Sequence, residues 1–204
     1  IVRDFLNPDM ILIGESDEKA GDILESIHRG MVDSKPEINR MNFSNAELCK
    51  ISINSYCTLK ITFANILADI CEQIPGGDVD IVSKAIGGDS RIGKKYIKGG
   101  LAFGGPCFPR DNRAIAFTAK RYGASQPMAE LTDAFNNKWR SEKIPSSVMK
   151  IMKAHEVSEV AILGLTYKND TTLVEESAAI YLVKALLKHG VKVSLFDPAG
   201  TPSA

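Results

Sequence analysis

The pattern of apolar and polar positions predicts short strands toward both ends of the chain and helices between them. Continuous apolar runs at 10–13 and 160–163 border glycine or polar residues, as buried strands do, and 191–196 (Val-Lys-Val-Ser-Leu-Phe) predicts another strand. The segment 33–41 carries Pro36 among polar residues and predicts a linker. Helical spacing between capping or breaking residues predicts helices at 17–29 (N-cap Ser16, C-cap Gly30), 44–73, 78–86 (N-cap Asp78), 112–122, 126–139, a continuation from Pro145 to 155, and 173–188.

The longest predicted helix, 44–73, is apolar on more than one face. Ser44 and Glu47 form a capping box at its start, and neither Pro nor Gly follows before Gln73. A helix that is apolar nearly all round has to be buried on several sides. We therefore expect a second copy of the chain to cover part of it, which would make the protein a homodimer through 44–73.

The strand at 160–163, the helix after it and the strand at 191–196 predict a parallel βαβ unit of Rossmann-like type. Two parallel strands need further strands and cover on both faces. We therefore expect either a longer parent chain or another segment that completes the sheet. The predicted fold class is mainly α with α/β flanks: an all-helical central domain that contains the long helix, followed by the start of a Rossmann-like domain.

Composition excludes several classes of protein. The 204 residues include 25 Lys+Arg and 25 Asp+Glu, and zero net charge argues against a nucleic-acid-binding surface. No run of 18 apolar residues is present, so no membrane span is expected. The first nine residues show no secretion signal. We expect a cytoplasmic protein with neither nucleic acid nor membrane as a partner.

The four cysteines and three histidines show no metal-ligand spacing, so no metal site is expected. Cys49, Cys57 and Cys71 lie in the long predicted helix, too far apart along its axis for a disulfide. We expect these three to be small buried hydrophobes. The histidines occupy helical or helix-end positions, which argues against a thiol hydrolase that pairs Cys with His.

Cys107 stands apart from the other cysteines, in a segment rich in Gly and Pro. It follows a glycine turn and precedes a helix that begins near Pro109, so backbone N–H groups and Arg110 would stabilise a thiolate there. Asp111, four residues on, could orient a water or accept a proton. The position suits covalent attack on a carbonyl, and it equally suits a buried loop cysteine beside a capping aspartate.

Other polar and aromatic residues allow two interpretations each. Lys50 lies four residues before Asn54 on one helix face, where it either reaches to solvent or is held for a purpose. A basic run from Arg91 to Lys98 is either a solvated face or a phosphate site. Tyr96 and Phe103 suit core packing as well as stacking on a ring.

The segment Gly164–Lys168 follows a predicted strand, at the sheet edge where α/β proteins bind ligands. It is not a G-x-G-x-x-G sequence, and that dinucleotide fingerprint occurs nowhere in the chain.

Five short motifs follow one another in a fixed order over most of the chain. They are Ala46–Asn54 (A-E-x-x-K-x-x-x-N), Asp89–Gly93 (D-x-R-I-G), Ala102–Asp111 (similar to G-G-x-C-x-x-K-D), Gly164–Lys168 and Phe196–Pro198. In order and spacing they resemble the motifs of the UDP-glucose/GDP-mannose dehydrogenase family. That family oxidises the C6 hydroxyl of a nucleotide-linked sugar to a carboxylate, with two hydride transfers to NAD.

The resemblance implies roles for individual residues. Cys107 would be the nucleophile that forms a thiohemiacetal and then a thioester, Asp111 would position or activate water, and Lys50 would stabilise an oxyanion. Asn54 would hold a water or the C6 oxygen. Arg91 would reach the substrate of a neighbouring subunit. The residues implied in nucleotide-sugar binding are Tyr96, Phe103, Gly104, Phe108, Tyr167 and Lys168.

The chain departs from the family's pattern at the cofactor. The arginine expected near NAD is replaced by Glu175, so Arg110, which stands where lysine is usual, is the one cofactor contact left. We expect residues 1–43 to be the end of an N-terminal NAD-binding domain and a linker, 44–157 the helical central dimerisation domain with the Cys loop, and 158–204 an incomplete nucleotide-sugar-binding domain.

The sequence thus predicts a fragment of an NAD-dependent nucleotide-sugar 6-dehydrogenase that makes a uronic acid from UDP-glucose or GDP-mannose. The segments Ala102–Gly105 and Arg110–Ala114 lean toward the GDP-mannose branch. Because the NAD-binding domain is missing, this chain alone is not expected to turn over. The alternative is a catalytically silent dimerising remnant that binds a nucleotide sugar or pairs with a full-length enzyme.

Overall fold

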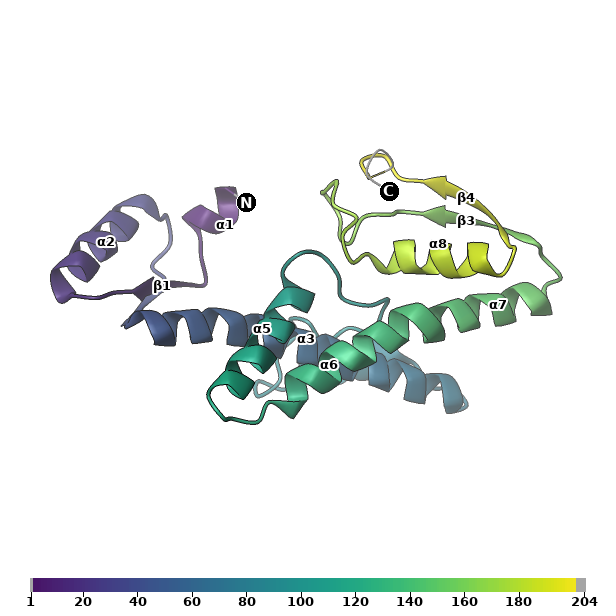
Figure 1. Ribbon diagram of the computed structural model, residues 1–204, viewed down its shortest axis with the longest axis horizontal. Coiled ribbons are helices and arrows are strands. Elements are labelled where there is room, and N and C mark those ends of the chain that lie inside the picture. The colour runs from purple at the N-terminus through teal and green to yellow at the C-terminus, as the bar shows by residue number, and fades with distance from the viewer. Residues whose placement is uncertain (1, 201–204) are drawn as a thin grey trace. The chain divides into compact units, whose positions relative to one another are not determined.

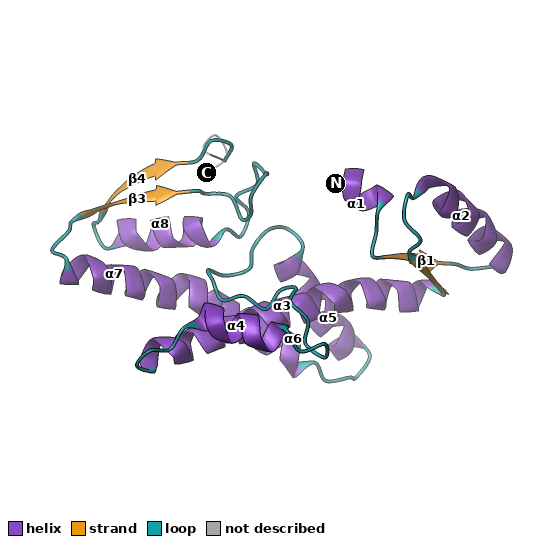
Figure 2. Ribbon diagram, turned by 180° about the vertical axis from the view of Figure 1, so that it is seen from behind, coloured by secondary structure: helices purple, strands orange, loops and turns teal. Residues whose placement is uncertain are grey.

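The computed structural model describes residues 2–200, and the chain divides into two compact units, Ile1–Ile53 and Asn54–Ala204. Helices dominate, and two pairs of short strands stand toward the two ends of the chain (Figure 1; Figure 2). The predicted fold class, mainly α with α/β flanks, is confirmed. The elements are α1 (Val2–Leu6), β1 (Met10–Gly14), α2 (Glu18–Met31), β2 (Glu37–Met41), α3 (Phe43–Gln73), α4 (Val79–Gly87), α5 (Phe108–Arg121), α6 (Pro127–Lys138), the π-helical turn η1 (Trp139–Lys143), α7 (Ile144–Ala154), β3 (Glu159–Leu163), α8 (Ala178–Lys188) and β4 (Lys192–Phe196).

The first unit contains a strand where the sequence predicted a linker. β2 pairs in parallel with β1, and Ile38 stands opposite Ile11. The prediction was wrong because Pro36 lies just outside the strand, where it removes no ladder hydrogen bond. The polar character of β2 is explained by Arg40, whose guanidinium forms ion pairs with the carboxylates of Glu15, Asp22 and Glu25.

Several helix ends differ from the predicted ones by a few residues. Asp17, not Ser16, caps α2 by accepting a hydrogen bond from the Ala20 N–H, and the helix continues past Gly30 to Met31. α3 begins at Phe43 and the Asn42 side chain accepts from the Asn45 N–H, so the Ser44 capping box does not form the start. Asp78 caps α4 as predicted.

In the second unit, α6, η1 and α7 follow one another without a break in the chain of helical turns. The sequence predicted that Pro145 restarts the helix, because proline has no N–H to donate and its ring crowds the preceding turn. The structure places a wider π-helical turn, Trp139–Lys143, directly before the turn that holds Pro145. A π-helical turn leaves more room for the proline ring and changes the direction of the side chains around it.

The second unit ends in the predicted parallel βαβ unit. β3 pairs with β4, with Val160 opposite Val193, and α8 lies between this pair and α7 (Figure 1; Figure 2). The core is formed by buried Met152, Leu182 and Leu186. α8 begins at Ala178 rather than at the predicted 173, because the carbonyls of Leu173 and Glu175 accept hydrogen bonds from the N–H groups of Tyr167 and Gly105 instead of continuing a helix.

The part of α3 in the second unit buries an unexpected face. Its buried residues are small or polar: Thr58, Thr62, Ala64, Asn65 and Cys71. Large apolar side chains on the same stretch are exposed, among them Tyr56 (62%), Phe63 (48%) and Ile70 (48%). No helix among the described residues is both long and apolar enough to cross a membrane.

Leu186 and Leu187 provide a matched test of where this core lies. Leu186 is fully buried in the α7–α8 cluster, and Leu187 is 56% exposed. Leu186→Ala should therefore lower the free energy of unfolding by roughly 2–5 kcal/mol, because it leaves a cavity. Leu187→Ala should change it by less than about 0.5 kcal/mol. Urea denaturation of both variants measures the difference; equal losses would contradict this assignment of the core.

Candidate functional site

The segment between α4 and α5, which carries most of the predicted site, is held by buried amide side chains. Asn65 of α3 accepts from the Gly100 N–H (2.8 Å) and donates to the Leu101 carbonyl (3.3 Å). Asn136 of α6 accepts from the Phe103 N–H (3.0 Å) and donates to the Phe103 carbonyl (2.9 Å). Both amides are 2% exposed, so they take the place of the secondary-structure partners that this irregular backbone lacks.

Aromatic contacts fix the rest of the segment. The Trp139 indole N–H donates to the Gly100 carbonyl at 3.1 Å. The Phe108 ring stands edge-on to the rings of Tyr96 and Phe103, with centroids 6.1 and 6.3 Å away. Tyr96 has φ of 64°, a left-handed conformation that is uncommon for a residue with a side chain. The aromatic trio therefore has one defined arrangement beside Cys107.

A cavity of about 500 Å³ opens beside this segment. It has the size of a small-molecule site, and aromatic side chains and two lysines line it. Seven residues predicted from the sequence lie on its wall: Tyr96, Phe103, Gly104, Cys107, Phe108, Tyr167 and Lys168. The other lining residues are Ile61, Asn65, Lys98, Gly100, Leu101 and Ala102.

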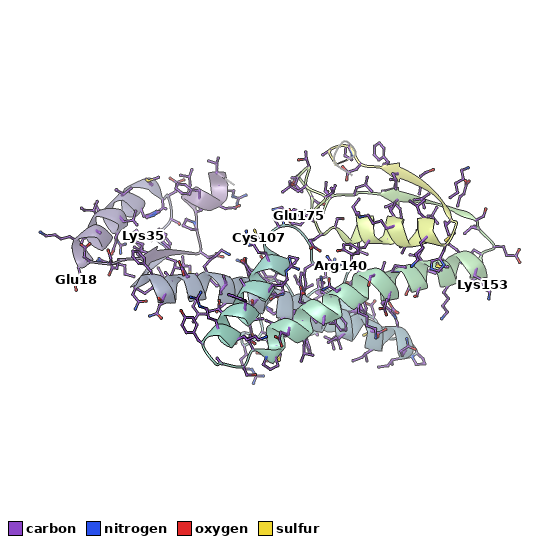
Figure 3. All side chains as sticks on the ribbon, in the orientation of Figure 1. Glu18, Lys35, Cys107, Arg140, Lys153 and Glu175 are labelled. Carbon is purple, nitrogen blue, oxygen red and sulfur yellow. The ribbon has the colours of Figure 1, made fainter. Side chains whose placement is uncertain are left out.

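Cys107 is exposed and stands directly before α5, at its N-cap position (Figure 3). The helix begins at Phe108, close to the start near Pro109 expected from the Cys107 segment and earlier than the start at 112 expected from the helical pattern. Pro109 occupies its first turn, where proline costs no hydrogen bond. The pKa of Arg110 is raised above its ordinary value, first by its hydrogen bond to Asp111 and also by the nearby Cys107. The structure thus combines the thiol with a helix N-terminus and a cation.

Asp111 is buried and held between two donors. The Asn54 side-chain amide donates to Asp111 Oδ2 at 2.6 Å, and Arg110 Nε donates to Oδ1 at 3.0 Å. Asp111 is 3% exposed, so its carboxylate is oriented by these bonds rather than by bulk water. The structure therefore brings together Asn54 and Asp111, which stand 57 positions apart in the sequence.

The loop after β3 brings Tyr167 and Lys168 to the cavity, and Asp197 holds that loop. Asp197 accepts hydrogen bonds from the N–H groups of Leu165, Thr166, Ala199 and Gly200. These backbone donors, first that of Leu165, lower the pKa of Asp197 to about 2. In the motif Phe196–Pro198, the aspartate is thus the residue that holds the loop after β3.

Two glycines allow the Cys loop to approach the loop after β3 closely. A side chain at Gly105 would overlap the Tyr167 ring, and Gly105 also has φ of 78°. A side chain at Gly104 would overlap the Glu176 carbonyl oxygen. The Gly105 N–H donates to the Glu175 carbonyl at 2.9 Å, which fixes this close approach.

Some predicted residues lie elsewhere. Arg91 is outside the Cys107 cavity; its guanidinium donates twice to the Asp89 carboxylate and borders a second cavity of about 330 Å³ lined by Tyr56, Phe63 and other apolar side chains. Lys50 is an exposed residue of α3 in the first unit. Glu175 is exposed next to the Cys loop, to which it gives its carbonyl (Figure 3).

The residues that hold the cavity segment from behind were not predicted from the sequence. Asn136 is an ordinary polar residue within a helix, and nothing in its neighbours indicates that it holds a loop. For Asn65 a signal was present, because it lies in an otherwise apolar stretch of α3, where an amide requires a buried partner. Among the described residues, no group of three or more His, Cys, Asp or Glu side chains is placed to hold a metal ion.

Comparisons with known proteins match both the central helices and the βαβ unit. The central domain of the UDP-glucose/GDP-mannose dehydrogenase family matches residues 44–138, and the UDP binding domain of the same family matches 161–204. The chain is 37% identical to the UDP-glucose 6-dehydrogenase of Rickettsia bellii over 98% of its length, and 32% identical to UDP-glucose 6-dehydrogenase TuaD of Bacillus subtilis over all of it. It covers 46% and 43% of these relatives, and so spans about half of their length.

A solved structure agrees with these matches. The UDP-glucose dehydrogenase from the archaeon Pyrobaculum islandicum superimposes with a TM-score of 0.86 at 30% identity. The superposition covers 98% of this chain and 45% of the archaeal chain.

The lowered pKa of Asp197 makes a prediction about stability and pH. Its folded pKa of about 2 lies below the ordinary value of about 3.9 for an unfolded Asp, so its stabilisation is fully present above about pH 4 and is lost as the pH falls toward 2. Asp197→Asn should therefore melt lower than the parent protein at pH 7, and the gap should narrow between pH 4 and 2. Thermal melts across this range measure the gap, with exposed Asp170→Asn as the control; a gap independent of pH would contradict the assignment.

Proposed function

Because the chain belongs to the UDP-glucose/GDP-mannose dehydrogenase family, we propose that its cavity binds a UDP-linked hexose and places the sugar C6 against Cys107. The observation that carries this proposal is that Cys107, from the central helices, and Tyr167 and Lys168, from the βαβ unit, line the same cavity. UDP-glucose is the proposed substrate, since the relatives that match over the whole chain are named for it.

The cavity wall suits the two ends of such a ligand. Aromatic faces on the wall can stack on a base or a sugar ring. The ammonium groups of Lys98 and Lys168 can neutralise a diphosphate. The Lys168 Nζ lies 5.6 Å from the centroid of the Tyr167 ring, so a cation and a stacking surface stand together on one loop.

Cys107 acts in this proposal as the nucleophile. Its thiolate adds to the aldehyde carbon at C6 to give a thiohemiacetal. Once an oxidant had taken a hydride from that carbon, water would hydrolyse the resulting thioester to a carboxylate and return the thiol. Asp111, oriented by Asn54, accepts the proton of that water. Lys50 is proposed to stabilise the negative oxygen, the role implied by its place in the same motif as Asn54.

NAD is the proposed oxidant, but the described residues offer it no complementary site. The Glu175 carboxylate, exposed beside the Cys loop, would repel a pyrophosphate where the motif leads us to expect an arginine. Arg110 donates its Nε to Asp111. No step is therefore derived through the cofactor. This carboxylate also favours the second candidate, a chain that binds a nucleotide sugar without oxidising it.

The exposed apolar face of α3 supports a homodimer. Tyr56 and Phe63 line the 330 Å³ cavity beside Arg91, so a second copy that covers them would also bring Arg91 to the boundary between subunits. Such a face is unusual for a monomer, because burying it removes apolar surface from water.

Alkylation of Cys107 tests the proposed substrate. Saturating UDP-glucose should slow the reaction of Cys107 with iodoacetamide by about tenfold or more, because a ligand that fills the cavity shields the thiol. GDP-mannose is the comparison ligand, and half-buried Cys49 is the internal reference in the same mass spectra. Protection by GDP-mannose alone would overturn the choice of sugar, and absence of protection by both would overturn the proposed site.

The same cysteine separates the enzyme from the silent binder. In the whole protein that contains this chain, UDP-glucose and NAD should produce NADH, and Cys107→Ser should abolish its formation while Cys49→Ser retains it. Protection of Cys107 without any NADH would favour the silent binder.

A charged residue introduced on the exposed apolar face of α3 tests the proposed dimer. Phe63→Glu should shift the protein from dimer to monomer in light scattering at micromolar concentration, because a carboxylate there would have to be buried unpaired. Glu130→Gln, at an exposed position of α6 outside this face, is the control. A parent protein that is already monomeric under these conditions would contradict the dimer.

A further inference from the structure

The π-helical turn η1 directs three side chains to three different parts of the second unit. Trp139 donates to the backbone of the cavity segment at Gly100, and Lys143 forms ion pairs with Asp69 and Glu72 near the end of α3. Arg140 points to the βαβ unit, where it meets Glu176 (Figure 3). Turns of this type occur frequently at functional sites, because they change the direction of side chains within a helix.

Arg140 is 3% exposed, and Glu176 binds it through both its carboxylate and its backbone carbonyl. Its Nη2 lies 2.5 Å from the Glu176 carboxylate, and its Nη1 donates to the Glu176 carbonyl at 3.2 Å. The guanidinium also stacks over the Tyr181 ring at 4.0 Å and contacts the Asn137 side chain. The Nε of Arg140 is buried without a hydrogen-bond partner among the described residues, so the guanidinium depends on these contacts of its two Nη atoms and of its face to offset the cost of burial.

The residue that Arg140 holds is itself in an unusual conformation. Glu176 has φ of 55°, in the left-handed region that glycine favours. Such a conformation persists only where the surroundings impose it. Arg140 binds the backbone carbonyl and the side chain of Glu176 at once, and Arg113 of α5 stands 3.9 Å from the same carboxylate.

From Glu176 the contact continues directly to the Cys loop. The neighbouring carbonyl, that of Glu175, accepts from the Gly105 N–H, two residues before Cys107. The Glu176 carbonyl occupies the space that a side chain at Gly104 would need. The position of the 175–176 backbone therefore sets the position of the turn from which Cys107 projects.

We propose that Arg140 and Glu176 are a positioning pair that fixes the Cys107 loop against the βαβ unit, so that the thiol keeps its place at the N-terminus of α5. Neither residue lines the cavity, and the pair acts only through the 175–176 backbone. This inference rests on the proposed role of Cys107 as the reacting group.

The test measures the rate at which iodoacetamide alkylates Cys107 at pH 7 without any nucleotide sugar or cofactor. Arg140→Met and Glu176→Gln should each slow this rate by about 3- to 10-fold, and the double variant should slow it no further, since both changes break one pair. Arg140→Lys, which keeps the charge and one donor, should lie between the parent protein and Arg140→Met.

Lys143→Met is the matched control, because it removes a cation from the same π turn without touching the Cys loop. Buried Cys71 reports any general opening, since it reacts only if the unit loosens. An unchanged Cys107 rate in Arg140→Met, an equal loss in Lys143→Met, effects that add in the double variant, or a parallel rise in Cys71 alkylation would each overturn the positioning pair. Because no ligand is present, these outcomes are independent of whether UDP-glucose protects Cys107.

Discussion

The bidentate hydrogen bond between the Asn136 side chain and the backbone of Phe103 is the contact on which the site depends. The segment between α4 and α5 has no ladder or helix of its own to satisfy its backbone, so a buried amide takes that place. Asn65 does the same for Gly100 and Leu101. With the backbone fixed at these points, the aromatic side chains and Cys107 have a defined common wall rather than a mobile loop.

A second constraint joins this wall to the βαβ unit. The close approach of Gly104 and Gly105 to Tyr167 and Glu176 is possible only without side chains at the two glycines. The cavity is therefore a property of two structural layers, the central helices and the loops at the carboxyl ends of β3 and β4. The carboxyl ends of parallel strands are the edge at which α/β proteins bind ligands.

The fold class could be predicted from the sequence because it depends on local patterns, whereas the seven predicted residues of the cavity wall were named largely through the resemblance of their motifs to a known family. The periodicity of 44–73 predicts α3, and the Gly-rich setting of Cys107 predicts a special loop. The strand at Glu37–Met41 could not be predicted, since its polar residues are explained only by Arg40 and the carboxylates around it. The roles of Asn65, Asn136 and Arg140 depend on partners more than 30 residues away in sequence, which no local pattern specifies.

The π-helical turn between α6 and α7 has a consequence for how this protein tolerates change in length. An α-helix rotates by about 100° per residue, so removal of one residue within Trp139–Lys143 would turn everything after the deletion about the helix axis. The side chains themselves would be unchanged, but the βαβ unit would contact the central helices in a different orientation about the helix axis. The geometry around Cys107 therefore depends on the number of residues in α6, η1 and α7 as well as on their identity.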